Sequence, residues 1–339
     1  MIVRGHRVTL VTPSEARINA EARGRGIPVV NLPVGRKQPR GILALRAWLK
    51  SNPVDIINTH SSTDSWLAAL AVIGLKDAPL IVRTRHISAP VPGNRATNWL
   101  YQRATKHIVT TGEKLRQTLV RENGFRAESI TSIPTGIDTD HYSPGDRAAA
   151  RQALNLPADA AMIGIVATLR SWKGHRYLLD AFQQLQRANT YLVIVGDGPQ
   201  RGALREHIAA LGIANQVVMP GNQQDVLPWL RAMDIFVLPS YANEGVPQAI
   251  LQAMACGLPV ISTPVGSITE AVDDLVTGLL VPPHDATALK QAIARLLDDA
   301  EERARFGHAG RAKAERQFGS DRMLDAMEAV FLQAAERHG

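Results

Sequence analysis

The sequence predicts an α/β protein made of two Rossmann-like domains, each a doubly wound parallel sheet, that face a central cleft. Short runs rich in β-branched residues alternate with helical stretches, which is typical of parallel sheets covered on both faces. There are twelve such runs, more than one doubly wound sheet usually carries. A turn-rich segment at 134–146 divides them six and six. Ligands of such sheets bind at the carboxyl ends of the strands, so we look for function there.

The expected elements follow in chain order. Strands of the first domain are expected at 8–12, 27–32, 54–60, 80–86, 107–111 and 129–134. Strands of the second are expected at 162–169, 191–198, 216–221, 235–240, 259–263 and 277–282. A closing helix is expected at 321–337, because one face of it is apolar at helical spacing.

Composition fits a soluble globular protein, with 45% hydrophobic and 20% charged residues. No stretch approaches the roughly 18 to 20 apolar residues of a membrane helix, and the start does not resemble a signal peptide. The expected location is therefore the cytoplasm. The single cysteine, Cys256, excludes an internal disulfide framework and a cysteine-based metal cluster. It lies in an apolar run, which predicts a buried and inert thiol.

Charge is uneven along the chain. Residues 1–143 hold 20 Lys and Arg against 10 Asp and Glu, a net of +10, whereas residues 144–339 hold 18 against 21, a net of −3. A basic half beside an acidic half suggests that the first half meets an anion. Nucleic acid, an anionic membrane face and a phosphorylated acceptor all qualify, and an ordinary basic surface also fits. No nucleic-acid recognition module is visible and only 5% of residues are aromatic, so nucleic acid ranks last.

The stretch 241–259 is the most informative. It reads as a loop followed by an apolar helix, with Gln248 and Gln252 four residues apart on one face. Glu244 lies just before that helix, where backbone amides and the helix dipole favour an anion. By itself the pattern fits a carboxylate that caps a core helix as well as one that binds a ligand in the cleft.

Several other strand ends carry polar side chains. Lys173 lies in the turn after the expected strand 162–169. His86 ends the fourth strand of the first half beside Arg83 and Arg85, which favours a functional role over a structural one. His60, followed by Ser61, ends the strand before it.

Taken together, these stretches resemble the retaining family 4 (group 1) glycosyltransferases, which have the GT-B fold. The similarity covers nearly the whole chain. It rests on GHRVTLVTP (5–13), IPTGIDTDHYSP (133–144), VATLRSWKGH (166–175), VGDGP (195–199), EGVPQAILQAMACGLPVI (244–261) and PVGSITEAV (264–272).

The resemblance assigns roles to individual residues. Glu244 matches the glutamate that contacts hydroxyls of the donor sugar, and Lys173 the lysine that contacts its diphosphate. His86 matches a histidine that faces the donor sugar across the cleft. We therefore expect these three to be the catalytic residues. The expected donor-binding residues are Arg170, Thr168, Gly196, Gly198, Gly245, Val246, Gln248 and Gln252, and those of the acceptor side are His60 and Ser61.

Two positions depart from the family pattern. Gln252 replaces the second glutamate, which contacts the ribose, and a glutamine can still hydrogen-bond a ribose hydroxyl. Thr168 stands where an arginine is expected, and Arg170 could supply that charge two residues later. Asp138 and Asp140 form an Asp-x-Asp pattern, but they lie in the interdomain passage and lack the converging oxygens that a metal needs. We expect no essential metal and no cofactor besides the nucleotide sugar.

The start of the chain resembles the second strand of the family, without the first strand and its glycine-rich turn. In a doubly wound sheet, a missing central strand would leave two parallel neighbours without partners, unless those two pair with each other. The resemblance implies domains at 1–143 and 144–320, with a closing helix at 321–339 that packs back on the first. We expect the natural product to be longer, or this chain to be poorly active.

The predicted function is retaining transfer of a hexose-like sugar from a nucleoside diphosphate to a cell-envelope glycan or a lipid-linked acceptor, of the lipopolysaccharide or exopolysaccharide type. We also expect weak peripheral association with the inner face of the membrane. A non-catalytic sugar-nucleotide-binding paralogue is the alternative. It is suggested by Thr168, by Gln252 and by the missing first strand with its glycine-rich turn. The base, sugar, linkage, acceptor and oligomeric state are not predicted.

Overall fold

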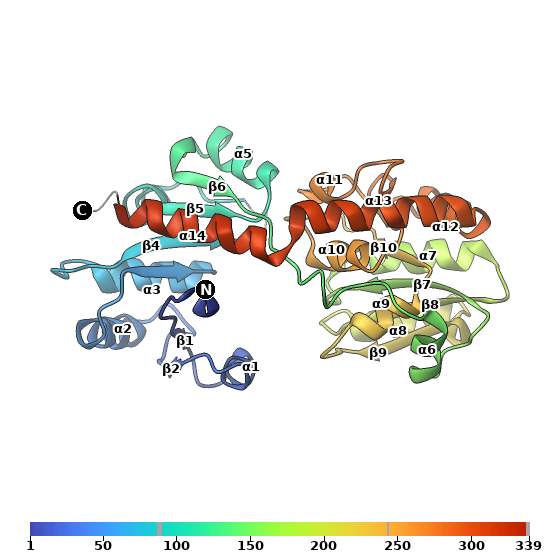
Figure 1. The fold of residues 1–339 in the computed structure, drawn as a ribbon, viewed down its shortest axis with the longest axis horizontal. Helices are drawn as coiled ribbons and strands as arrows, with labels where there is room; N and C mark the ends of the chain where they lie inside the picture. The colour runs from blue at the N-terminus through green and yellow to red at the C-terminus, as the bar shows by residue number, and fades with distance from the viewer. Residues whose placement is uncertain (87–89, 243, 337–339) are drawn as a thin grey trace. The chain divides into compact units, whose positions relative to one another are not determined.

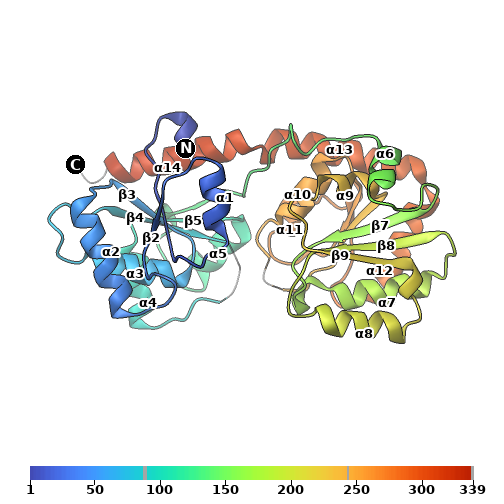
Figure 2. The ribbon, with the colours of Figure 1, turned by 90° about the horizontal axis from the view of Figure 1, so that it is seen from below.

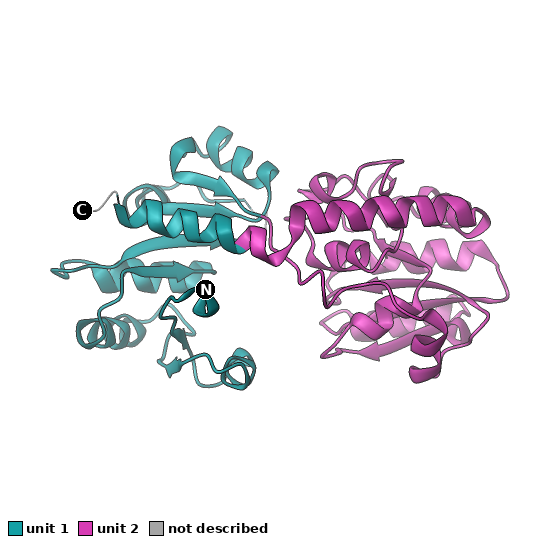
Figure 3. Ribbon diagram, in the orientation of Figure 1, with its two compact units in different colours: residues 1–133, 324–339 teal, residues 134–323 magenta. Residues whose placement is uncertain are grey.

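The computed structural model describes residues 1–86, 90–242 and 244–336. They form two compact units: Met1–Ile133 with Leu324–Gly339 is unit 1, and Pro134–Met323 is unit 2 (Figures 1 and 3). All twelve predicted strands are present in the described residues, and every paired strand is parallel to its neighbour.

Unit 2 is built on a six-stranded sheet with the order β12-β11-β10-β7-β8-β9. Its strands are β7 (Ala161–Val166), β8 (Thr190–Val195), β9 (Val217–Gly221), β10 (Ile235–Leu238), β11 (Val260–Ser262) and β12 (Gly278–Leu280). From β7 the chain winds outward through β8 and β9, then returns to the other side of β7 for β10. The boundary between β7 and β10 is therefore the topological switch point, where a doubly wound sheet opens a crevice for ligands.

Helices cover both faces of this sheet, with α7, α8 and α12 on one face and α9 and α10 on the other (Figure 2). Strands buried on both faces have no solvated side, which explains their near-continuous apolar sequences. The helices of unit 2 are α6 (Arg147–Ala153), α7 (His175–Leu185), α8 (Arg201–Ala210), α9 (Leu227–Ala232), α10 (Gln248–Ala255), α11 (Ile268–Ala271), α12 (Ala286–Asp298) and α13 (Ala300–Phe318), with 3₁₀ turns η4 (Ser171–Lys173) and η5 (Ala214–Gln216).

Unit 1 holds a four-stranded sheet and a separate pair of strands. The sheet runs β3 (Ile56–Thr59), β4 (Leu80–Arg85), β5 (His107–Thr110), β6 (Ile130–Ser132), and β1 (Leu10–Thr12) pairs with β2 (Val29–Asn31). Its helices are α1 (Ile18–Gly24), α2 (Pro39–Ser51), α3 (Ser62–Val72), α4 (Arg95–Trp99) and α5 (Glu113–Arg121), with short turns η1 (Ile2–Arg4), η2 (Leu100–Ala104, a π-helical turn) and η3 (Ala127–Ser129).

The six strands of unit 1 thus do not form one sheet. β1 and β3 are not hydrogen-bonded to each other, so the closure in which these two strands pair is not adopted by the described residues. Among the described residues, β1 has β2 as its hydrogen-bonded neighbour strand and β3 has β4.

The closing helix α14 (Ser320–Glu336) belongs to unit 1 from Leu324 onward. Nη1 of Arg4 lies 2.7 Å from Oδ1 of Asp325 and 3.0 Å from Oε2 of Glu328. Nε2 of His6 lies 2.5 Å from Oε1 of Glu328. These contacts hold the first residues of the chain on the closing helix.

The division between the units falls ten residues before the predicted boundary at 143. Hydrogen bonds explain the difference, because they hold segment 134–143 on unit 2. The amide of Ile137 donates to the carbonyl of Phe318 at 2.9 Å, and the amide of Ser320 donates to the carbonyl of Ile137 at 2.8 Å. Nε of Arg231 donates to the carbonyl of Ser143 at 3.0 Å.

Cys256 is buried at the end of α10, as predicted, and burial raises the pKa of its thiol to about 12. The thiol is therefore a weak nucleophile at neutral pH. Across the part of the chain that the structure describes, no helix combines the length and the apolar character that a membrane crossing requires.

Candidate functional site

In unit 2, three loops that carry predicted site residues follow adjacent strands, β10, β7 and β8. Because the carboxyl ends of parallel strands share one edge of the sheet, the three loops lie next to one another at the switch point. The turn after β7 carries Thr168 to Lys173, the loop after β8 carries Gly196 and Gly198, and the loop after β10 carries Glu244.

Glycine lets the turn after β7 approach the loop after β10. Gly174 has φ +77°, and a Cβ there would overlap with the carbonyl oxygen of Pro239, so no other residue fits without a backbone shift. The amide of Tyr241 donates to the carbonyl of Trp172 at 2.8 Å, which joins the same two segments.

This approach brings Lys173 and Glu244 together, although 71 residues separate them in the chain. Nζ of Lys173 donates to Oε1 of Glu244 at 2.7 Å, and Oγ of Ser240 donates to the same oxygen at 2.6 Å. Glu244 is only 5% exposed. No described residue donates to Oε2, so this oxygen can accept a hydrogen bond from a ligand hydroxyl.

Backbone contacts hold Glu244 from the other side. Gly266 has φ +59°, and a Cβ there would overlap with the carbonyl oxygen of Glu244. The hydroxyl of Thr263 donates to the carbonyl of Ser240. The carboxylate is therefore held in one position by two strand-end loops, which is what precise contact with a ligand requires.

Arg170 supplies a second positive charge in the turn after β7. Its guanidinium lies over the ring of Trp172, 5.6 Å from the centroid, and has no carboxylate partner among the described residues. Thr168 is exposed, and its carbonyl accepts from the amide of Arg170 at 2.7 Å. Arg170 is thus available to an anion, whereas Lys173 already has one.

The loop after β8 packs against this turn. Gly196 has φ +138°, and a Cβ there would overlap with the carbonyl oxygen of Ala167; a Cβ on Gly198 would lie 2.7 Å from the carbonyl oxygen of Leu169. Gly196 and Gly198 are therefore required for the close approach of the two backbone segments. Such close approach is typical of a loop that binds a phosphate.

The remaining donor-side residues lie around the start of α10. Gly245 and Val246 are buried, and Gln248 is exposed at the first position of the helix. Gln252 is half-buried.

In unit 1, the ends of β3 and β4 bring His60 and His86 together. Nδ1 of His60 lies 3.0 Å from Nε2 of His86, and the ring planes are 13° apart. Ser61 caps α3: its hydroxyl accepts from the amides of Thr63 and Asp64, and Oδ1 of Asp64 accepts from its amide at 2.8 Å. The hydroxyl of Ser61 is thereby engaged in a capping box.

Arg83 and Arg85 belong to β4 and precede His86 in the chain. Arg83 is 5% exposed, with its guanidinium 4.3 Å from the centroid of the Tyr101 ring, and Nη1 of Arg85 donates to the Tyr101 hydroxyl at 2.7 Å. Burial lowers the pKa of Arg83. Elsewhere, Oδ1 of Asp138 accepts from the amides of Asp140 and His141, so this carboxylate stabilises a turn.

Sequence reasoning missed Ser240, which contacts Glu244, and Asn58, which contacts His60. Nδ2 of Asn58 lies 3.2 Å from Nε2 of His60. Both are polar residues at or near the carboxyl end of a strand whose neighbours had been singled out. That position could have identified them.

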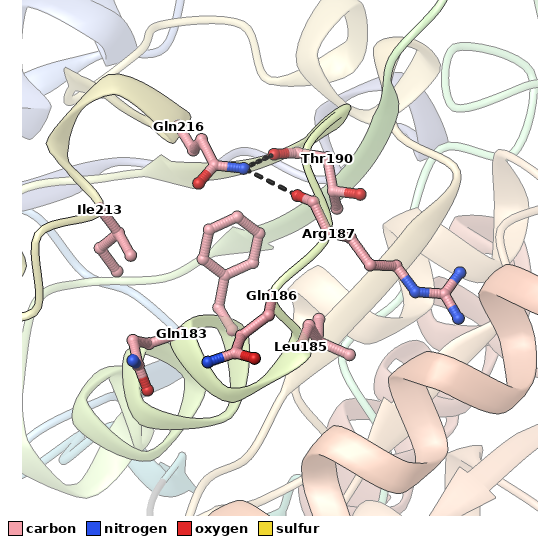
Figure 4. A pocket seen from close by; sticks show the side chains of 8 residues that line it. Gln183, Leu185, Gln186, Arg187, Thr190, Ile213 and Gln216 are labelled. Carbon is pink, nitrogen blue, oxygen red and sulfur yellow. Dashed lines mark hydrogen bonds between the residues drawn. The ribbon is translucent and has the colours of Figure 1, made fainter.

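A separate hollow in unit 2 does not belong to this site. It has a volume of about 20 Å³ and lies at the start of β8, at the opposite end of the strand from Gly196 (Figure 4). Nε2 of Gln216 donates to the carbonyls of Arg187 and Thr190 there. That volume suits a single water.

Comparison with known proteins agrees with this geometry. Residues 1–141 match the model of glycosyltransferase family 4, and residues 146–313 match that of group 1 glycosyl transferases. The chain is 30% identical over 319 residues to a D-inositol 3-phosphate glycosyltransferase from Saccharomonospora viridis, covering 87% of this chain and 73% of that protein.

Two solved structures share the fold over nearly the whole chain. Anabaena Alr3699/HepE in complex with UDP-glucose is 25% identical, with a TM-score of 0.83 and coverage of 97% of this chain and 90% of that one. Sucrose-phosphate synthase from Thermosynechococcus elongatus is 23% identical, with a TM-score of 0.85 and coverage of 98% and 90%.

Proposed function

This chain belongs to the group 1, family 4 glycosyltransferases of the GT-B fold, and on that premise we propose that it moves a hexose from a nucleoside diphosphate to an envelope glycan or lipid-linked acceptor with retention of configuration. Its donor is a nucleotide sugar, as in the complex of the related Anabaena protein with UDP-glucose.

One observation carries the donor assignment: Lys173 and Glu244 meet at the switch point of unit 2. Oε2 of Glu244, to which no described residue donates, suits the hydroxyls of a sugar. Lys173 suits the diphosphate attached to that sugar, and so does Arg170, which has no carboxylate partner among the described residues, because cations bind phosphate oxygens through charge-assisted hydrogen bonds. The two halves of a nucleotide sugar thus find complementary groups on neighbouring loops.

The proposed reaction is attack from the face that the diphosphate leaves. The bond between the anomeric carbon and the diphosphate oxygen breaks, the acceptor oxygen bonds to the same carbon, and the acceptor proton passes to the departing diphosphate. Negative charge grows on the diphosphate in the transition state. Preorganised cations stabilise such charge most effectively, which gives Lys173 and Arg170 their role. With two cations in place, we propose that no metal is required and that excess EDTA leaves turnover unchanged.

The acceptor is proposed to be anionic. Its support is the net charge of +10 over residues 1–143 and the nearly buried Arg83 beside the strand-end histidines. The related proteins named D-inositol 3-phosphate glycosyltransferase and sucrose-phosphate synthase point the same way, since both names include a phosphorylated sugar or polyol. A lipopolysaccharide or exopolysaccharide intermediate would satisfy the same chemistry when it carries phosphate.

A specific observation favours a second candidate, a sugar-nucleotide-binding protein without activity. Gln252 stands where the family has a ribose-binding glutamate, and a glutamine side chain offers a ribose a neutral amide in place of a carboxylate.

The test starts from binding and ends with turnover. Thermal-shift measurements with UDP, GDP and ADP, each alone, identify the base that the protein binds. Release of that nucleoside diphosphate from its nucleotide sugars is then measured with phosphorylated and with unphosphorylated acceptors. We expect one of the three nucleoside diphosphates to raise the melting temperature. We also expect Glu244→Gln to lower turnover by about 100-fold or more. Stabilisation without turnover for any acceptor would favour the binding protein, and no stabilisation by any diphosphate would overturn the donor site.

A further inference from the structure

A continuous line of polar side chains joins β4 to β3 in unit 1 and ends at His86. Oγ1 of Thr84 lies 3.0 Å from Oδ1 of Asn58, and Nδ2 of Asn58 lies 3.2 Å from Nε2 of His60. Nδ1 of His60 lies 3.0 Å from Nε2 of His86. The two imidazole planes differ by only 13° and the ring centroids lie 5.3 Å apart, a separation that with the short contact places the facing nitrogens close to both ring planes. Donors and acceptors must alternate along this line.

The buried end of the line sets its direction. Thr84 is 7% exposed, and Oδ1 of Asn58 is the acceptor that the described residues offer to its hydroxyl proton. The amide nitrogen of Asn58 then faces His60, whose Nε2 must accept. A neutral His60 therefore carries its proton on Nδ1 and donates it to Nε2 of His86.

The opposite direction leaves a buried group unsatisfied. If Nε2 of His86 donated, His60 would donate in turn to an inverted Asn58 amide, whose NH₂ would point at Thr84. The Thr84 hydroxyl could accept that bond, but its own proton would have no acceptor among the residues the structure describes. A buried donor without a partner costs about 1–3 kcal/mol, which favours the first direction.

Both rings are neutral near pH 7, as the alternation requires. Desolvation by surrounding protein atoms lowers the pKa of His60 and of His86, although solvent still reaches both rings. The charge of His60 lowers the pKa of His86 further, whereas the Asp64 carboxylate opposes these effects at both rings.

We infer that His60 is a positioning residue that makes His86 present Nδ1–H, a hydrogen-bond donor, to an oxygen of the sugar substrate. This inference rests on the proposed function for its substrate class. His86 is exposed at the end of β4, and no described residue accepts from its Nδ1. That nitrogen holds a proton, so it binds a substrate oxygen and does not act as the base that deprotonates the acceptor. The deprotonation then falls to the departing diphosphate.

The tautomers can be measured directly, without any substrate. In the 339-residue chain with ¹⁵N-labelled histidine, two-bond ¹H–¹⁵N correlation spectra at pH 8 distinguish a protonated from an unprotonated ring nitrogen. Spectra of the His60→Asn and His86→Asn variants assign the two rings. We expect Nδ1 protonated and Nε2 unprotonated in both. A His86 ring protonated at Nε2 instead would overturn the inference.

Two nearly isosteric variants test the role of His60. Asparagine can place an amide N–H where Nδ1 of His60 lies, whereas aspartate offers only acceptors there. We expect His60→Asn to keep the His86 tautomer. His60→Asp should move the His86 proton to Nε2, and its turnover should be about tenfold or more below that of His60→Asn, the value of about one hydrogen bond.

A merely structural role for His60 predicts a different result. It would give both variants the same turnover and leave the His86 tautomer unchanged in His60→Asp, and either outcome would overturn the inference. Failure of the proposed function is distinguishable, because it would appear as the expected wild-type tautomers together with no turnover for any nucleotide sugar.

Discussion

Nζ of Lys173 lies 2.7 Å from Oε1 of Glu244, and this ion pair connects the turn after β7 to the loop after β10. The side chain of Glu244 is 6% exposed and that of Lys173 is 19% exposed. Each charge of a buried ion pair has lost its hydration, and the attraction of its partner compensates for that loss. If one partner is removed, the remaining charge keeps its desolvation cost without compensation.

Removal of one member of this pair should therefore cost more than removal of both. We expect Lys173→Met to lower the free energy of unfolding of unit 2 by about 3 kcal/mol, and Lys173→Met with Glu244→Gln to recover part of that loss. Urea unfolding of the four proteins of this cycle gives the coupling energy. Strictly additive losses would show that the pair is not coupled. Turnover should fall in every variant, by about 100-fold or more, because each lacks a group that contacts the donor.

Ser240 should matter through Glu244. Its hydroxyl donates to Oε1 at 2.6 Å, so Ser240→Ala leaves the carboxylate with one fixed donor fewer. We expect kcat/KM to fall roughly tenfold, the value of one hydrogen bond to a charged group. Ser262→Ala is the matched control: Ser262 is equally buried, and its hydroxyl donates at 2.6 Å to the carbonyl of Leu238, away from the carboxylate. Equal loss in the two variants would argue for a packing effect.

The stability of unit 2 should depend on His175. This ring is 2% exposed and its nitrogens make no hydrogen bond to a described residue. Burial, with a smaller contribution from the charge of Lys173, lowers its pKa from 6.5 to about 4. The unfolded chain thus binds a proton that the folded chain does not bind between these values. The resulting stabilisation is complete above about pH 6.5 and is lost as the pH falls toward 4.

The size of this effect follows from linkage. One proton gives a slope of up to about 1.4 kcal/mol per pH unit, and the shift in pKa amounts to about 3 kcal/mol in all. The unfolding free energy of the wild type minus that of His175→Leu should fall by about 3 kcal/mol between pH 7.5 and pH 4, because the variant lacks this slope. Parallel curves would show that the ring titrates normally.

The exposed face of α2 should contribute to binding at anionic membranes. Arg40, Leu43, Ala47 and Lys50 follow helical spacing and are all exposed, with Leu43 at 66%. Each cation near an anionic surface is worth about 1 kcal/mol. Arg40→Glu with Lys50→Glu should therefore reduce sedimentation with anionic vesicles at low salt by roughly tenfold or more. The control is Arg205→Glu with Arg316→Glu, which removes the same charge from exposed positions of unit 2. Equal binding of the wild type to neutral and anionic vesicles would contradict an electrostatic contribution.

The sequence alone predicted every strand and the closing helix, for a local physical reason. A strand buried on both faces must be apolar over its whole length, and an amphipathic helix must repeat its apolar face every three to four residues. Neither requirement depends on the rest of the fold. The same holds for the motifs, because Lys173, Glu244, His60 and His86 each lie where an expected strand has just ended.

The tertiary structure alone decided which of these residues meet. Lys173 and Glu244 come together because β10 returns to the free side of β7, and strand order is a non-local choice that no single segment encodes. His60 and His86 likewise meet because β3 and β4 are adjacent strands. The buried hydroxyl of Thr84 on β4 needs an acceptor, and Asn58 on β3 supplies it, which sets the direction of the hydrogen bond between the two histidines. Segment 134–143 lies in unit 2 for the same reason: its partners are distant in sequence and near only after folding.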